Sequence, residues 1–279
     1  MRKPATIFTH QLVKDSATKA LAVVGITETV AAVVGFSMAD ILPKSAGWLE
    51  RLAIFAFGYI ILCVLVALCS YLRDKNGVNI KVNTNDVSVI VGNLFEETGL
   101  KIIPFNERFD TTVDDRVISK SSLNGIFVNR YADLSKLKAV LNKEEKTTLS
   151  GPVEVDGKAY YPLGTVKPFE DYALVAFTHM DEFDRAHLSR GEYEECLMAM
   201  WQELSRVYAG RRIVLPLLGS GITRFDDGCP SDDELLQCIL CTLRTSGQTF
   251  RDGVEIVLTK KTVDKMRLFE VRQYSTTWR

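Results

Sequence analysis

Twenty-one consecutive residues of this 279-residue chain carry no charge: LAIFAFGYIILCVLVALCSYL, from Leu52 to Leu72. As an α-helix this run would extend about 31 Å at roughly 1.5 Å per residue, which matches the hydrocarbon thickness of a bilayer. Charged residues flank the run on both sides, as they do at the ends of membrane spans. We therefore expect a transmembrane helix at about 52–72; a buried helix of a soluble core is the alternative.

A second apolar run, from Ala20 to Ala39, has about the same length but smaller side chains and one charge near its middle, Glu28. A signal peptide is the rival interpretation, although this run begins too late and continues too long for a usual hydrophobic region of a signal. We expect a second span at about 20–39, so residues 1–76 form a two-helix membrane hairpin.

Lysine and arginine counts orient this hairpin. A hairpin places both chain ends on one side, and Lys and Arg residues are enriched in cytoplasmic segments. The two flanks contain more Lys and Arg residues than the connection does: Arg2, Lys3, Lys14, Lys19, Arg73, Lys75 and Lys81 against Lys44 and Arg51. Both termini, and the large domain at 77–279, are therefore predicted to be cytoplasmic.

Small residues recur every four positions in the first span, at Ala31, Gly35 and Ala39, a pattern that lets helix backbones approach closely. Packing within one hairpin accounts for it, and so does self-association of protomers. Glu28 is costly in hydrocarbon unless it is protonated, paired or facing water. It lines a pore in one hypothesis and is a neutral group bonded to Thr27, Thr29 or a neighbouring helix in the other.

The remaining charges are balanced. The first 72 residues hold ten charges, and the last 207 hold 28 basic and 31 acidic groups, so no basic excess favours nucleic-acid binding. Six scattered cysteines do not predict a disulfide framework, and Cys238 and Cys241 lack the second pair that a zinc site needs. No Walker A, G-x-S-x-G or H-E-x-x-H motif occurs. We expect no metal and no cofactor.

After a polar connector, DKNGVN, strand-like and helical patterns alternate. This predicts a three-layer α/β domain with helices on both faces of a mixed sheet. Strands are expected within 81–95, 100–105, 172–178, 213–218 and 254–259, a hairpin around Asp156-Gly157 within 153–166, and helices at 134–143, 191–209, 231–244 and 262–273, with a short helix or strand in 119–131.

The most informative stretch is Arg211–Phe225, RRIVLPLLGSGITRF, in which a buried strand leads into Gly219-Ser220-Gly221. Glycines there allow backbone amides to converge on a phosphate beyond the carboxyl end of a strand, where open α/β sheets bind ligands. A tight turn that needs positive φ explains the same glycines.

PLLGSGITRF resembles the diphosphate-binding loop of macro domains. VIVGNLFE resembles their first strand and adenine-side turn, and IIPFNERFD resembles the strand that carries the ribose-side Asn; SKSSLNGIFV, residues 119–128, takes the place of the first phosphate loop. The resemblance covers roughly Val82–Gln273. It implies ligand contacts from Asn93, Asn106, Ser121, Ser122, Leu123, Asn124, Gly125, Gly219, Ser220, Gly221, Ile222, Thr223 and Arg224.

The chain also departs from the macro-domain pattern. Gly92-Asn93 replaces the common Gly-Asp, the two-Asn ribose motif is reduced to Asn106, and Gly125 stands where hydrolytic members have three glycines. Binding survives these changes better than hydrolysis of ADP-ribose conjugates does. Two alternatives stay open. Arg224 either contacts the ligand or is a solvated loop cation, and His179 or Asp181 either contacts the ligand or belongs to a solvated loop.

Two membrane spans joined to such a domain resemble the membrane-anchored macro-domain effectors of the Thoeris anti-phage system. The resemblance implies a multi-pass protein of the bacterial inner membrane and no catalytic residue of its own. Its macro domain would sense an ADP-ribose-derived signal, of the histidine-ADP-ribose type, made by a partner TIR-domain enzyme. The signal would cause homo-oligomerisation, membrane disruption and abortive infection. The alternatives are a membrane-tethered ADP-ribosyl hydrolase and a scaffold with an empty pocket.

Overall fold

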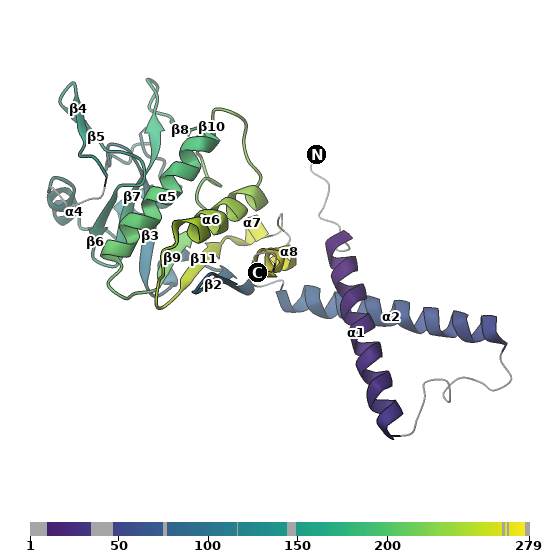
Figure 1. The fold of residues 1–279 in the computed structure, drawn as a ribbon. Coiled ribbons are helices and arrows are strands. Elements are labelled where there is room, and N and C mark those ends of the chain that lie inside the picture. The colour runs from purple at the N-terminus through teal and green to yellow at the C-terminus, as the bar shows by residue number, and fades with distance from the viewer. Residues whose placement is uncertain are drawn as a thin grey trace. The chain divides into compact units, whose positions relative to one another are not determined.

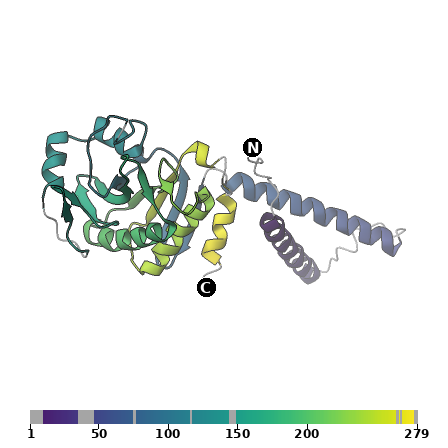
Figure 2. The same ribbon diagram turned by 90° about the horizontal axis from the view of Figure 1, so that it is seen from above.

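A computed structural model describes residues 10–34, 47–74, 77–115, 117–143, 149–263, 266 and 268–276 of the chain. It divides into two compact units, one comprising residues 1–76 with 268–270 and the other comprising 77–267 with 271–279. Figures 1 and 2 show the elements of both units, each of which is described by itself.

The first unit consists of α1 (His10–Val34) and α2 (Trp48–Asp74). The two helices contact each other, and the Tyr59 hydroxyl donates a hydrogen bond to the Ala17 carbonyl at 2.9 Å. Within Trp48–Ser70 of α2, a stretch of 18 residues has a mean hydropathy of 2.9 and is 6% buried, so by length and composition alone this helix is able to cross a membrane.

The first predicted span, 20–39, is helical as far as the structure describes it, because α1 covers it to Val34 and residues 35–39 lie outside the described part. The Thr27 and Thr29 hydroxyls donate to backbone carbonyls of their own helix, those of Val23 and Gly25, both at 2.8 Å. Within the described residues one buried carboxylate oxygen of Glu28 has no hydrogen-bond partner. The proposed bonds from Thr27 and Thr29 to Glu28 are therefore not formed at this oxygen. Gly35 and Ala39 of the small-residue pattern fall outside the described residues.

Nine strands of the described second unit form one mixed sheet, as the sequence predicts. Its parallel centre runs β2–β11–β9–β3–β7, with antiparallel β1 beside β2 and antiparallel β6 and β8 beside β7; short β10 pairs with β8. The strands are β1 (Gly77–Val82), β2 (Asn85–Val91), β3 (Leu100–Asn106), β6 (Val166–Phe169), β7 (Tyr172–Met180), β8 (Ala186–Leu188), β9 (Ile213–Pro216), β10 (Arg224–Phe225) and β11 (Val254–Leu258).

Helices cover both faces of this sheet (Figures 1 and 2), which confirms the predicted three-layer arrangement. The long helices α5 (Arg190–Val207) and α6 (Asp232–Ser246) pack side by side on one face, and both begin with a Ser-x-x-Glu capping box. The other layer contains α3 (Leu123–Arg130) and α4 (Leu134–Leu141). Because neighbouring residues of a strand point to opposite faces, Phe105 and Leu174 pack with Phe127 of α3 in one core cluster.

The hairpin at Asp156-Gly157 is confirmed. β4 (Val153–Val155) pairs with β5 (Lys158–Tyr160), and φ is +49° at Asp156 and +71° at Gly157, the pair of positive values that a type I′ turn requires. The remaining short elements are η2 (Leu94–Glu96), α7 (Lys260–Val263) and α8 (Leu268–Thr276).

Two predicted elements are wrong. Residues 77–79 belong to strand β1 rather than to a connector, because Val78, Ile80 and Val82 are the buried alternate positions of an edge strand whose other residues are polar. The single helix predicted at 262–273 is two helices, α7 and α8, since α7 ends at Val263 and α8 begins at Leu268.

Candidate functional site

A cavity of about 620 Å³ lies at the carboxyl ends of the five parallel strands. Residues that end or follow β2, β3, β7, β9 and β11 all line it, together with the start of α3. Ligands of open α/β sheets bind outside this edge of the sheet. The cavity is therefore the candidate binding site.

Eleven of the thirteen predicted ligand residues line this cavity: Asn93, Asn106, Ser121, Ser122, Leu123, Asn124, Gly219, Ser220, Gly221, Ile222 and Thr223. Gly125 and Arg224 are absent from the lining of the described cavity. A Cβ at Gly125 would lie 2.1 Å from the Ser119 carbonyl oxygen, so this glycine permits close backbone packing. Arg224 is exposed on β10, where the strand pairing with β8 places it opposite His187.

The loop after β9 contains a hydrogen-bonded turn, followed by backbone amides that have no acceptor within the described chain. Gly219 has φ +85°, and the Ser220 hydroxyl donates to the Leu217 carbonyl at 2.7 Å. Over the described chain, the N–H groups of Gly221, Ile222 and Thr223 have no hydrogen-bond acceptor. A Cβ at Gly221 would meet nothing within 4 Å, so a ligand has room to approach this backbone. The tight-turn explanation thus holds for Gly219, whereas residues 221–223 offer amide donors for an anion.

Both predicted asparagines at strand ends use their side chains to build turns. The Asn93 Oδ1 accepts from the Phe95 amide at 3.2 Å and caps η2, while its Nδ2 donates to Glu96 at 2.7 Å. The Asn106 Oδ1 accepts the amides of Arg108 and Asp110 at 3.1 and 3.2 Å. These carboxamides shape the rim of the cavity.

Asn124 has a different environment. It is the second residue of α3, whose N-cap Ser122 accepts the Gly125 amide at 3.0 Å. The Asn124 side chain is 8% exposed, and within the described part its Oδ1 is buried without a hydrogen-bond partner. A buried acceptor without a partner costs about 1–3 kcal/mol, and a donor that reached this oxygen would remove that cost.

Six polar lining residues were not predicted as ligand contacts: Ser119, in the loop before α3, and five others. Thr178 lies near the end of β7, Asp232 begins α6, and Thr259, Lys261 and Thr262 follow β11. Among the lining residues that the structure describes, Lys261 is the cation and Asp232 the carboxylate. Each lies at the end of a parallel strand or the start of a helix, and that position was the available signal.

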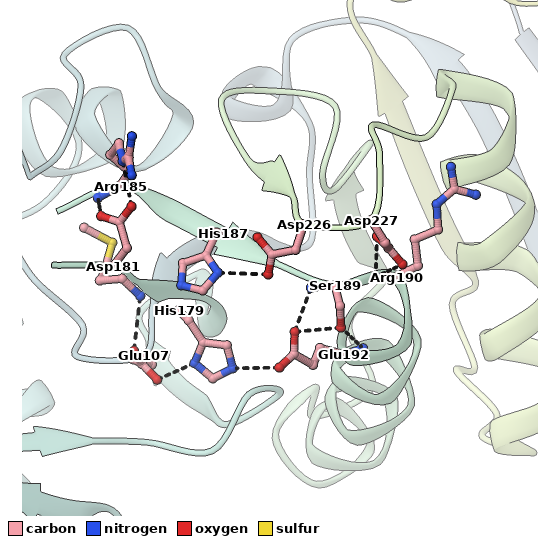
Figure 3. Close-up of polar contacts among 11 residues, drawn as sticks. Glu107, His179, Asp181, Arg185, His187, Ser189, Arg190, Glu192, Asp226 and Asp227 are labelled. Carbon is pink, nitrogen blue, oxygen red and sulfur yellow. Dashed lines mark hydrogen bonds and ion pairs between the residues drawn. The ribbon is translucent and has the colours of Figure 1, made fainter. Parts of the chain in front are cut away.

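His179 and Asp181 are not in the described cavity lining. They belong to a polar cluster beside it, around the β7–β8 connection and the start of α5 (Figure 3). His179 Nδ1 lies 2.6 Å from Glu107 Oε2, and Asp181 Oδ2 accepts from Arg185 Nε at 2.6 Å, closing the connection.

Cys238 and Cys241 lie on α6, where burial raises the pKa of both thiols, that of Cys238 to about 12. Raised thiol pKa values disfavour the thiolates that bind metals. In the part of the chain that the structure describes, no three His, Cys, Asp or Glu side chains come together as a metal site.

A mixed sheet with a parallel centre, helices on both faces and a cavity at the strand ends is the arrangement of an α/β ligand-binding domain, and macro domains have this arrangement. The family model of the macro domain of Thoeris protein ThsA matches residues 87–259, and this chain belongs to that family. A curated relative, Thoeris protein ThsA of Bacillus amyloliquefaciens (strain Y2), is 34% identical over 226 residues, which cover 76% of each chain.

Similar solved structures are those of the Oceanobacillus iheyensis macrodomain. A mutant of it with ADPR is 14% identical, covers 73% of this chain and 100% of its own, and has a TM-score of 0.47. The same macrodomain with ADP is 16% identical, covers 72% of this chain and 95% of its own, and has a TM-score of 0.45.

Proposed function

We propose that the macro domain is the sensor of an anti-phage effector and binds an ADP-ribose-type nucleotide in the cavity. A diphosphate needs convergent donors, which the unpartnered amides of 221–223 supply, and Lys261 is a cation in the lining of the same cavity. A base needs an apolar wall, which Leu94, Ile118 and Phe105 provide. The observation that carries the proposal is that one cavity is lined both by residues 221–223, with their unpartnered amides, and by Asn124, whose buried oxygen has no partner within the described chain.

The signal in this proposal is an ADP-ribose derivative of the histidine-ADP-ribose type, produced by a partner TIR-domain enzyme. Membership of the Thoeris ThsA family supports a role in defence against phage. A cavity of about 620 Å³ is within the range that holds a nucleotide-sized ligand.

The amino-terminal unit is proposed to be a two-helix hairpin in the bacterial inner membrane, with both termini in the cytoplasm. The length and apolar character of α2 support one span, and the described part of the predicted second span, residues 20–34, is helical. Oligomerisation of these hairpins would then disrupt the membrane. Such a signal must bind the assembled state more tightly than the resting state, since equal affinity shifts no population.

A sensor is favoured over a hydrolase because the Asn93 and Asn106 carboxamides and the Ser122 hydroxyl are used in turns and a helix cap. Asp232 is the carboxylate of the described lining and would be the general base of the alternative, a membrane-tethered ADP-ribosyl hydrolase. Replacing Asp232 by Asn separates the two, because a sensor keeps binding whereas a hydrolase loses turnover.

The test is calorimetric titration of the full-length chain in detergent with ADP-ribose and its histidine conjugate, followed by mass spectrometry of the recovered ligand. Saturable binding of intact ligand is expected for the sensor. A cleaved ligand would establish the hydrolase, and the absence of heat with both ligands would overturn the proposal.

A second measurement addresses the membrane. The chain is reconstituted in vesicles loaded with a fluorescent dye, and leakage is followed with and without the ligand that binds. Leakage is expected only with ligand, with empty vesicles and Asn124→Leu protein as controls. Binding without any leakage would retain the sensor and reject membrane permeabilisation.

A further inference from the structure

Five titratable side chains form a cluster beside the cavity, here termed the histidine cluster (Figure 3). It draws on five elements or their ends and consists of Glu107 after β3, His179 of β7, His187 of β8, Glu192 of α5 and Asp226 after β10. None of them is a lining residue of the described cavity. However, residues next to Glu107, His179 and His187 in the chain do line the cavity, namely Asn106, Thr178, Met180 and Ala186.

His179 lies between two carboxylates. Its Nδ1 is 2.6 Å from Glu107 Oε2, and its Nε2 is 3.6 Å from Glu192 Oε1. A neutral imidazole has one N–H, so one of its nitrogens would present a lone pair to a carboxylate. Only the imidazolium offers a proton to both partners, and loss of its proton would break the longer contact, the one to Glu192.

Glu107 anchors this arrangement to the cavity wall. Its side chain is 11% exposed, and its Oε1 accepts the Met180 amide at 3.2 Å. Its own amide donates to the Thr178 carbonyl at 2.8 Å. The pairing of β3 with β7 shifts register between Phe105 and Asn106, so that Asn106 lies opposite Thr178. The hydrogen bonds of Glu107 thus connect the irregular ends of β3 and β7, which place Asn106, Thr178 and Met180 in the lining.

On the other side, Glu192 belongs to the capping box of α5. Its Oε2 accepts the amide and the hydroxyl of Ser189 at 2.6 and 2.7 Å, which lowers the pKa of its carboxyl group. The carboxylate is therefore charged at neutral pH and available to His179. When His179 is an imidazolium, it connects the end of β3 to the first turn of α5.

Other titratable groups also lie near His179. The His187 ring lies 6.0 Å away, centre to centre, and its Nδ1 is 3.1 Å from Asp226 Oδ2. The hydrogen bond with Glu107, followed by the charges of Glu107, Glu192 and Asp226, outweighs burial and raises the pKa of His179 above its ordinary 6.5. A stabilising contribution of this kind is complete below the unfolded value of 6.5 and is lost as pH rises through the higher folded value.

We propose that His179 is a proton-dependent clamp: its imidazolium form joins Glu107 to Glu192 and holds the wall of Asn106, Thr178 and Met180 in the geometry that binds ligand. Release of the proton frees the start of α5 and lowers the affinity of the cavity. The ligand part of this inference rests on the proposed nucleotide-binding function; the clamp itself is a property of the chain without ligand.

The first measurement follows the histidine ring signals of the full-length chain by NMR over about pH 5 to about pH 9, a range that brackets the ordinary histidine pKa. The chain has three histidines, so His10→Gln, His179→Gln and His187→Gln assign each signal. His179 is expected to titrate above 6.5, and Glu192→Gln is expected to lower its midpoint while the contact with Glu107 remains. A midpoint for His179 at or below 6.5 would overturn the clamp.

The second measurement is ADP-ribose affinity of the same full-length proteins across this pH range. Wild-type affinity is expected to fall roughly fivefold as pH rises through the His179 midpoint, the low end of typical coupling between sites. His179→Gln should remove this fall, whereas His187→Gln, the control with similar exposure, should keep it. An unchanged pH profile in His179→Gln would also overturn the proposal.

If ADP-ribose binds at no pH in this range, the proposed ligand is rejected. The clamp is then tested by a third measurement. The free energy of unfolding of the ligand-free chain should decline more steeply with rising pH in wild type than in His179→Gln. Equal slopes in the two proteins would reject the clamp independently of any ligand.

Discussion

The side chains of Asn106 and Asp110 are joined by a hydrogen bond from Nδ2 to Oδ2 of 2.9 Å. Arg108 Nε donates to the same Asp110 oxygen, also at 2.9 Å. Asn106, which ends β3, therefore organises the turn that follows it in the chain. Its influence on a ligand is expected to come through the shape of the rim as well as through any direct contact.

Asn106→Ala is predicted to lower the free energy of unfolding by about 1–3 kcal/mol, because it removes the acceptor of two amides in a buried turn. Denaturant unfolding followed by tryptophan fluorescence measures this loss. Asn129→Ala is the control, since Asn129 is exposed on α3. Stability equal to wild type in Asn106→Ala would show that the turn does not depend on this side chain.

Asn124→Leu is predicted to separate stability from binding. The substitution removes a buried acceptor that has no partner within the described chain, so stability should remain or rise. ADP-ribose affinity should fall roughly tenfold if that oxygen receives a ligand hydroxyl, as a lost hydrogen bond of about 1.4 kcal/mol implies. Calorimetry and thermal unfolding of the same sample measure both quantities, and loss of stability with unchanged affinity would assign Asn124 to the core.

The two glycines after β9 should respond differently to a methyl group. Gly219→Ala places a Cβ at φ +85°, 3.1 Å from Leu235, and should destabilise the domain by about 1–2 kcal/mol. Gly221→Ala meets no neighbour and has no positive φ, so stability should be retained while ADP-ribose affinity decreases. Comparison of unfolding midpoints and affinities tests the pair; full affinity in Gly221→Ala would move the diphosphate away from this loop.

Lys261 and Arg224 distinguish a lining cation from an exposed one. Lys261 lines the cavity, so Lys261→Ala should weaken ADP-ribose binding roughly fivefold at low salt, the effect of about 1 kcal/mol from one charge in water. Arg224 lies outside the lining, and Arg224→Ala should leave affinity unchanged, contrary to the expectation from sequence. Titrations at two salt concentrations measure both, and the reverse order of effects would contradict the placement of the phosphates.

The caps of α5 and α6 form a matched pair. Ser189→Ala and Ser231→Ala each remove a capping box and should each cost about 1 kcal/mol of stability. Only Ser189→Ala also disturbs the carboxylate that faces His179, so only this variant should shift the His179 titration. An equal shift in both variants would attribute the change to general loosening of the helices.

Much of the macro domain could be predicted from local patterns. The buried strand that became β9, the capped helix that became α6 and the Asp156-Gly157 turn each depend on neighbouring residues alone. β1 was missed because an edge strand with alternating polar residues resembles a connector until its partner is known.

The site was predictable in position but not in detail. The order of strands and glycines indicated which loops meet, and most predicted residues line one cavity. Asn93 and Asn106 build their turns with partners two to four residues away, so these roles are local in the chain. The burial of the Asn124 oxygen and the position of Lys261 in the lining depend on packing between segments far apart in the chain.

The sequence by itself determined the apolar character of residues 52–72, the alternation of strands and helices, and the loop at Gly219–Thr223, because each is encoded within one short segment. Only the tertiary structure decided that Glu107 and Glu192 meet on the two sides of His179. These residues are 72 and 13 positions from it along the chain, and strand pairing and helix packing, rather than any local pattern, bring them together.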